Sequence, residues 1–106
     1  MIKGILYAPE AIEDLRKIEE YISVDLDNKH SAVKIVDKII DKIDSLSELP
    51  EIGSPLSSRI NIKTDYRYLV CGSYNVFYRI ENGFVQIIRS LNARRNFMLI
   101  LFGQDE

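Results

Sequence analysis

Apolar residues recur every three or four positions in two long stretches of the chain. Charged residues fill the positions between them, so each stretch predicts an amphipathic helix with one buried stripe. The connection at residues 27–30 is short and polar, which favours an antiparallel helix hairpin. The predicted stripes are Ile12, Leu15, Ile18, Ile22 and Leu26 in the first helix, and Val33, Val36, Ile39, Ile40, Ile43 and Leu46 in the second.

Local signals mark the beginnings and ends of these helices. Residues 2–7 form a short apolar run that predicts a first strand, and Pro9 behind it fits the first turn of a helix. Asn28 or Ser31 can cap the second helix, because both side chains accept hydrogen bonds from free backbone amides. The helical region ends within residues 49–56, which carry two prolines and a glycine.

Three later segments, at residues 66–70, 74–80 and 84–91, have the composition of strands. The last two are separated by Asn82-Gly83, a strong hairpin signal because both residues tolerate positive φ. We therefore expect a three-stranded antiparallel meander. Val85, Ile87, Arg89 and Leu91 should share one side of the last strand. Neither face of this sheet is wholly apolar, and the helix hairpin can cover only one of them.

Residues 97–102 form a six-residue apolar tail. Such a tail would promote aggregation if it were free, so we expect it to pack on the protein's own core, with another chain as the alternative. Together these patterns predict a single α+β domain over residues 1–106. It contains one N-terminal strand, an antiparallel helix hairpin, a three-stranded antiparallel meander and a short C-terminal apolar tail or helix.

The net charge of −2 hides a division along the chain. Residues 1–58 contain seven Lys or Arg and twelve Asp or Glu, whereas residues 59–106 contain seven and four. Six of the seven basic residues in the second part are arginines, whose planar side chain suits bidentate contacts with phosphate. An anionic partner is one explanation of this asymmetry, and an ordinary solvated sheet face is the other.

Residues that often carry chemistry are scarce. Cys71 is the only cysteine and is expected to be a buried strand thiol, while His30, the only histidine, should lie exposed in the helix connection. Neither belongs to a cluster, so we expect no metal and no other cofactor. The chain has no leader-like segment and no apolar run near the roughly 20 residues that span a bilayer, so we expect a cytoplasmic protein without membrane contact.

Several stretches, taken in order, resemble the RelE/ParE family of toxins. They include Tyr-Ala-Pro-Glu-Ala at residues 7–11, Leu-Pro-Glu-Ile-Gly at 49–53, Tyr-Asn-Val-Phe-Tyr-Arg-Ile at 74–80 and Ile-Arg-Ser-Leu-Asn-Ala-Arg-Arg-Asn-Phe at 88–97. The resemblance covers nearly the whole chain. It implies a growth-inhibiting toxin of a type II toxin–antitoxin system of the plasmid-stabilisation type. Such a toxin is held inactive by a cognate antitoxin, whose C-terminal segment wraps it as a helix or an added strand.

The family includes two mechanisms. RelE-like toxins cut mRNA on the ribosome, whereas ParE-like toxins bind DNA gyrase and catalyse nothing themselves. The leading hypothesis is ribosome-dependent mRNA cleavage by a metal-independent endoribonuclease, with Arg67, Arg89 and Tyr68 as candidate catalytic residues. The alternatives are a gyrase-binding toxin and a homologue that only binds its antitoxin. Relative to RelE-like nucleases, the usual catalytic groups are replaced by Tyr66, Tyr68, Asn75, Asn92 and Phe97.

Under either mechanism, arginines of the second half are the candidates for binding nucleic acid or another target. For Arg67 and Arg89 a structural ion pair is the alternative role, and for the tyrosines it is packing within the strands. The candidate binding residues are Arg67, Arg79, Arg89, Arg94 and Arg95.

Overall fold

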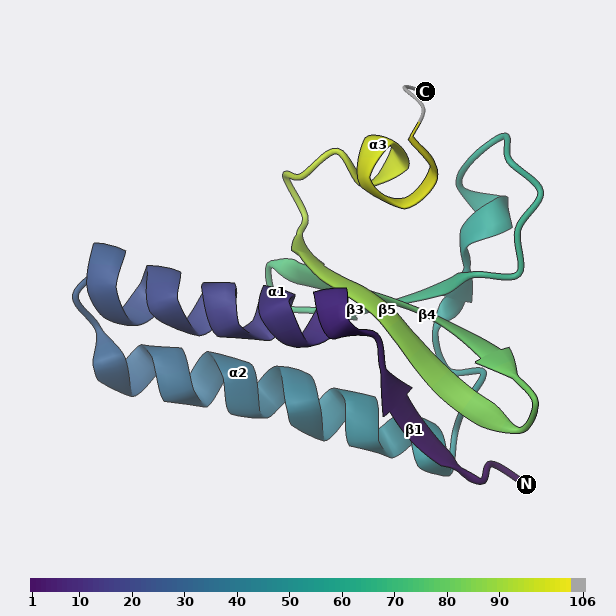
Figure 1. The fold of residues 1–106 in the computed structure, drawn as a ribbon, viewed down its shortest axis with the longest axis horizontal. Helices are drawn as coiled ribbons and strands as arrows, with labels where there is room; N and C mark the ends of the chain where they lie inside the picture. Colours follow the sequence, from purple (N-terminus) through teal and green to yellow (C-terminus); the bar gives the residue numbers. More distant parts are fainter. Residues whose placement is uncertain (104–106) are drawn as a thin grey trace.

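A mixed β-sheet separates the helices of this protein into groups on its two sides. The computed structural model describes residues 1–103 (Figure 1). The long hairpin of α1 and α2 lies against one side of the sheet and extends beyond it, and the short helix α3 lies on the other side. The elements are β1 (Gly4–Tyr7), α1 (Pro9–Glu20), a π-helical turn (Tyr21–Asp25), α2 (Lys29–Asp44), a 3-10 turn (Ser45–Ser47), β2 (Ser54–Pro55), a 3-10 turn (Leu56–Ser58), β3 (Arg67–Cys71), β4 (Tyr74–Glu81), β5 (Phe84–Asn92) and α3 (Phe97–Phe102).

Within residues 1–103, five strands form one sheet in the order β1-β5-β4-β3-β2. The predicted meander is confirmed, because β3, β4 and β5 pair antiparallel in sequence order. Asn82 and Gly83 both have positive φ, 54° and 82°, as the hairpin signal requires. The N-terminal strand β1 adds parallel to β5. The sequence pattern does not predict β2, because two residues are too few to show an alternation.

An irregularity in β5 changes which of its side chains share a face. Phe77 pairs with Arg89 but Tyr78 pairs with Ile87, so one extra residue of β5 is accommodated between them. Such a bulge reverses the alternation of side chains beyond it. Ile87 therefore packs with the hairpin, whereas Leu91 joins the cluster on the other side. The prediction that Val85, Ile87, Arg89 and Leu91 share one side is wrong for this reason.

The hairpin buries a face of α1 that differs slightly from the predicted stripe. Ile18 and Ile22 are buried as expected, but Ile12 is 57% exposed and its neighbour Ala11 is fully buried. Asp14, at the same face as Ala11 and Ile18, also turns toward the sheet. The tip of the hairpin extends beyond the sheet (Figure 1). Leu26 and Val33, on either side of the connection between the helices, are 55% and 56% exposed. The core on this side combines buried residues of both helices and the sheet, namely Ala11, Ile18, Ile22, Ala32, Ile39, Ile43, Leu46, Leu69, Tyr74, Val76, Tyr78, Val85 and Ile87.

The connection within the hairpin follows the local signals only in part. Asn28 caps α2, since its side chain accepts a hydrogen bond of 3.0 Å from the amide of Ser31. The first helix, however, ends at Glu20 rather than near Leu26, and residues 21–25 widen into a π-helical turn. His30 lies in the first turn of α2 and is exposed.

The helix hairpin covers one face of the sheet, as expected, and the second face is covered by the C-terminal segment. Leu56, Phe77 and Leu91 are buried there, packed against α3 and against Ile60, Tyr66 and Tyr68. The rings of Phe77 and Phe97 lie 5.3 Å apart. The apolar tail is therefore helical and packs on its own chain, as predicted. Asn96 caps it through the amide of Leu99, and Gly103 ends it at a φ of 69°.

Two isoleucine substitutions test this assignment of the core. Ile39→Ala removes a fully buried side chain and should lower the free energy of unfolding by about 2–5 kcal/mol. Ile12→Ala is the matched control and should change it by less than about 1 kcal/mol, because Ile12 is mostly exposed. Urea denaturation of the two variants measures the difference. Equal losses of unfolding free energy would contradict the finding that Ile12 lies outside the buried face of α1.

Candidate functional site

Asp14 of α1 makes a buried ion pair with Arg89 of β5. Its carboxylate accepts hydrogen bonds of 2.7 and 2.8 Å from Nε and Nη2 of Arg89, and a third of 3.0 Å from the amide of Ser90. The amide of Ser90 needs this partner because β1 pairs with β5 only as far as Ile87. Beyond the end of β1, the Asp14 carboxylate thus accepts the hydrogen bond from β5 that a longer parallel strand would accept.

Arg89 is held in this ion pair by burial and by charge. The side chains of Asp14 and Arg89 are only 8% and 23% exposed. The hydrogen bond that Arg89 donates to Asp14 raises the pKa of Arg89, against the opposing effect of burial, so the guanidinium stays charged. Arg89 was a candidate for catalysis and target binding, and the structure puts it in the structural ion pair that was its alternative role.

Arg67 of β3 fixes the loop that precedes β2. Its Nε donates to the carbonyl of Gly53 and its Nη2 to the carbonyl of Glu51, both at 3.1 Å. Tyr78 reinforces the same loop, because its hydroxyl donates to the Pro50 carbonyl at 2.8 Å and accepts from the Gly53 amide at 3.0 Å. A Cβ at Gly53 would come within 2.6 Å of that hydroxyl, so the loop needs glycine there.

Arg79 of β4 is also tied within the chain. It forms ion pairs with Asp65 at 2.8 Å and with Glu81 at 3.3 Å, and its guanidinium lies 5.8 Å from the centre of the Tyr66 ring. The hydrogen bond with Asp65 raises the pKa of Arg79. Its positive charge is therefore met by two carboxylates.

The tyrosines on β3 and beside it pack against the C-terminal helix. Tyr66 stacks on Phe102 at 5.7 Å between ring centres. Arg59 lies 5.1 Å from the ring of Tyr68 and 5.6 Å from that of Phe97, and so joins β3 to α3. The sequence did not single out Arg59, whose only signal was membership of the arginine-rich half. Tyr68 is part of this packed cluster and is partly buried.

Arg94 and Arg95 stand apart from the other arginines. Both are exposed in the turn after β5, and neither has an ion-pair partner within residues 1–103. They line a hollow of about 410 Å³ together with Lys17 and Tyr21 on the side of the helix hairpin. Sequence reasoning missed Lys17, because it belongs to the acidic half of the chain and meets the arginines only in the folded molecule.

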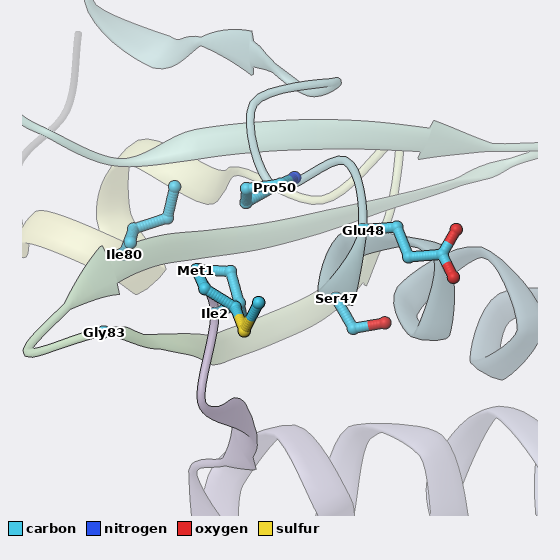
Figure 2. Close-up of a pocket in the computed structure, with 7 residues that line it drawn as sticks. All are labelled: Met1, Ile2, Ser47, Glu48, Pro50, Ile80 and Gly83. Atoms are coloured by element: carbon cyan, nitrogen blue, oxygen red, sulfur yellow. The ribbon is translucent and has the colours of Figure 1, made fainter.

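A larger hollow of about 840 Å³ lies at the opposite end of the sheet (Figure 2). Met1, Ile2, Pro50 and Ile80 give it apolar walls, and Glu48 is the charged residue at its margin. No basic side chain lines it among the described residues. Its lining is therefore mainly apolar.

The described residues contain few other features that bear on chemistry. Within residues 1–103, no three His, Cys, Asp or Glu side chains come close enough to hold a metal ion. Cys71 is partly buried beside the hairpin core rather than wholly buried as expected. Over the same residues, no helix combines the length and the apolar character needed to cross a membrane.

Comparisons with known proteins bear on the whole chain. Residues 5–97 match a family model described as the ParE toxin of type II toxin–antitoxin system, parDE. Among solved structures, one chain from the chromosomal ParDE TA system of P. aeruginosa has a TM-score of 0.72 and 21% sequence identity, covering 87% of this chain and 96% of that one. At this identity the likeness shows a shared fold. A comparison with curated proteins found no match.

The ion pair at the sheet edge can be tested by removing one of its charges. Asp14→Asn keeps the size of the side chain but leaves Arg89 partly buried without a counter-charge, so it should cost about 3 kcal/mol of unfolding free energy. Glu13→Gln is the control, because the Glu13 carboxylate pairs with Arg16 on the exposed side of α1 and should change stability little. An Asp14→Asn protein as stable as the control in urea would show that the pair is not essential to the fold.

Proposed function

The chain belongs to the family of ParE toxins of type II toxin–antitoxin systems, and on that premise we propose that it arrests growth by binding DNA gyrase rather than by cutting mRNA. The observation that carries this proposal is the packing on the second face of the sheet. Residues at positions that supply catalytic groups in RelE-like nucleases are here packed among aromatic rings or lack a titratable group.

Cleavage of RNA through its 2′-hydroxyl needs a base, an acid and cations at the scissile phosphate. Tyr66 stacks on Phe102, and Phe97, which has no proton to give, packs on Phe77. Asn75 and Asn92 have no group that titrates. These features favour a toxin that acts by binding over the mRNA interferase that was the leading hypothesis.

The cations near this face are also engaged elsewhere. Arg67 donates to two loop carbonyls, Arg79 pairs with Asp65 and Glu81, and Arg89 pairs with Asp14. Arg94 and Arg95 remain available on the surface, with Lys17 beside them. We propose that this basic rim, defined as Lys17, Arg94 and Arg95, contacts the target.

A cognate antitoxin is proposed as the partner that keeps the toxin inactive. Several apolar side chains stand exposed along the helix hairpin. An amphipathic antitoxin segment that lays its apolar face on the hairpin would cover them. The exposed residues are Ile12, Tyr21, Val24, Leu26 and Val33.

Expression without an antitoxin tests the proposed target. A brief pulse of induced expression should stop growth, change plasmid topology and leave the 5′ ends of mRNA unaltered, because gyrase rather than the ribosome is bound. Plasmid supercoiling and mRNA ends are measured in the same cells. New mRNA ends at unchanged topology would instead support ribosome-dependent cleavage, and normal growth with folded protein accumulating would support a homologue that only binds its antitoxin.

The basic rim is tested by reversing its arginines. Arg94→Glu with Arg95→Glu should relieve growth arrest, since two cations facing the target become anions. The matched control is Lys34→Glu with Lys38→Glu, the same charge change at exposed positions of α2. Colony counts after induction, with protein amounts compared by immunoblot, give the result. Persistent toxicity of the arginine variant would rule the rim out as the target-facing surface.

A further inference from the structure

The hollow beside the basic rim is built from parts of the chain that are distant in sequence. α1 and the turn that follows it supply Lys17 and Tyr21, the start of β4 supplies Tyr74, and the end of β5 with its turn supplies Ser90, Arg94 and Arg95. Its volume of about 410 Å³ is large enough for a small anionic group with room beyond it. Tyr74 and Leu91 are buried in its wall, and Tyr21 is half exposed at its margin.

Ser90, one of the residues that line this hollow, has a buried hydroxyl that the fold leaves unused. The residue is only 2% exposed, and within the described part of the chain its hydroxyl has no hydrogen-bond partner. Its amide is already satisfied by Asp14, so the backbone role of Ser90 does not explain the hydroxyl. Leaving a buried hydroxyl unpaired is costly, and buried polar groups of this kind are normally satisfied.

Three carboxylates of α1 pair with arginines that do not line the hollow. Asp14 is taken by Arg89, and Glu13 and Glu20 are both held by Arg16 on the exposed side of the helix. Asn92 uses its side-chain oxygen to accept from the amide of Arg94 at 3.0 Å, which shapes the turn without adding charge. Lys17, Arg94 and Arg95 therefore line a hollow beside α1, while Glu13, Asp14 and Glu20 of that helix pair with Arg16 and Arg89.

We infer that this hollow binds a phosphate group carried by a nucleotide or a nucleic-acid strand. Lys17, Arg94 and Arg95 supply charged donors, and the Ser90 hydroxyl supplies a neutral one. A phosphate offers several acceptor oxygens at once, whereas a carboxylate has two, so phosphate uses this set of donors more fully. The ring of Tyr21 at the margin offers a surface on which a base stacks.

The inference extends the proposed function, in which the rim faces the target, but it is tested on the isolated chain. Amide shifts of Ser90, Asn92, Arg94 and Arg95 are followed by NMR at low salt during titration with inorganic phosphate, thymidine 5′-monophosphate, and twelve-residue oligothymidylates with and without a 5′-phosphate. Saturable shifts with the monophosphate indicate a free nucleotide. Shifts with both oligonucleotides but not with the monophosphate indicate a strand backbone. Either result supports the site.

Substitutions then separate the hollow from a merely charged surface. Arg94→Gln with Arg95→Gln should raise the dissociation constant by about tenfold or more relative to Lys34→Gln with Lys38→Gln. The two double variants have the same net charge. Ser90→Ala should weaken it by about fivefold. Without ligand the Ser90→Ala protein should be at least as stable as the parent, because it loses an unpaired buried hydroxyl.

Four results would overturn the inference. They are the absence of binding by every probe, equal affinity in the arginine and lysine variants, unchanged affinity in Ser90→Ala, and tighter binding of a glutamate-rich peptide than of any phosphate probe. Failure of the proposed function is separately visible. If Arg94→Gln/Arg95→Gln loses phosphate binding while growth arrest persists, the phosphate site is supported and its role in toxicity is excluded.

Discussion

The fold depends on one buried carboxylate, that of Asp14. β5 is longer than the parallel strand beside it, so the amide of Ser90 faces a helix instead of a strand. Burying an unpaired carboxylate there would cost on the order of several kcal/mol. Asp14 is tolerated because Arg89 neutralises it and three donors satisfy its oxygens. The same contacts dock α1 on the sheet edge, and the rotation of α1 that brings Asp14 inward leaves Ile12 exposed.

The bulge in β5 and the C-terminal helix determine what the other face of the sheet can do. Because the bulge reverses the alternation, Leu91 turns toward Phe77 and offers an apolar surface to α3. α3 then covers the face with aromatic rings, and Arg59 bridges Tyr68 and Phe97 across the contact. This face of the sheet is therefore a second core, while Arg94 and Arg95, which have no ion-pair partner within residues 1–103, lie at the edge beside α1.

Much of the fold could be predicted because its signals are local. The helix hairpin follows from apolar spacing, the meander from three strand-like segments and the Asn82-Gly83 turn, and the family from ordered sequence matches. The boundaries of the buried stripe were less accurate, because the partner of a helix decides its rotation. β2 and the bulge escaped prediction, since neither changes the local pattern of residue types enough to be recognised.

The candidate site separates what the sequence determined from what only the folded chain decided. The sequence by itself determined the two long helices, the three strands of the meander, the family and the concentration of arginines in the second half. It could not say which arginines are free, because their partners are distant: Arg89 meets a carboxylate 75 residues away, and Arg67 meets carbonyls 14 and 16 residues away. Lys17, from the acidic half, joins Arg94 and Arg95 for the same reason. Secondary structure reflects interactions between near neighbours in the sequence. Whether a charged side chain has an ion-pair partner depends on which residues tertiary packing brings beside it.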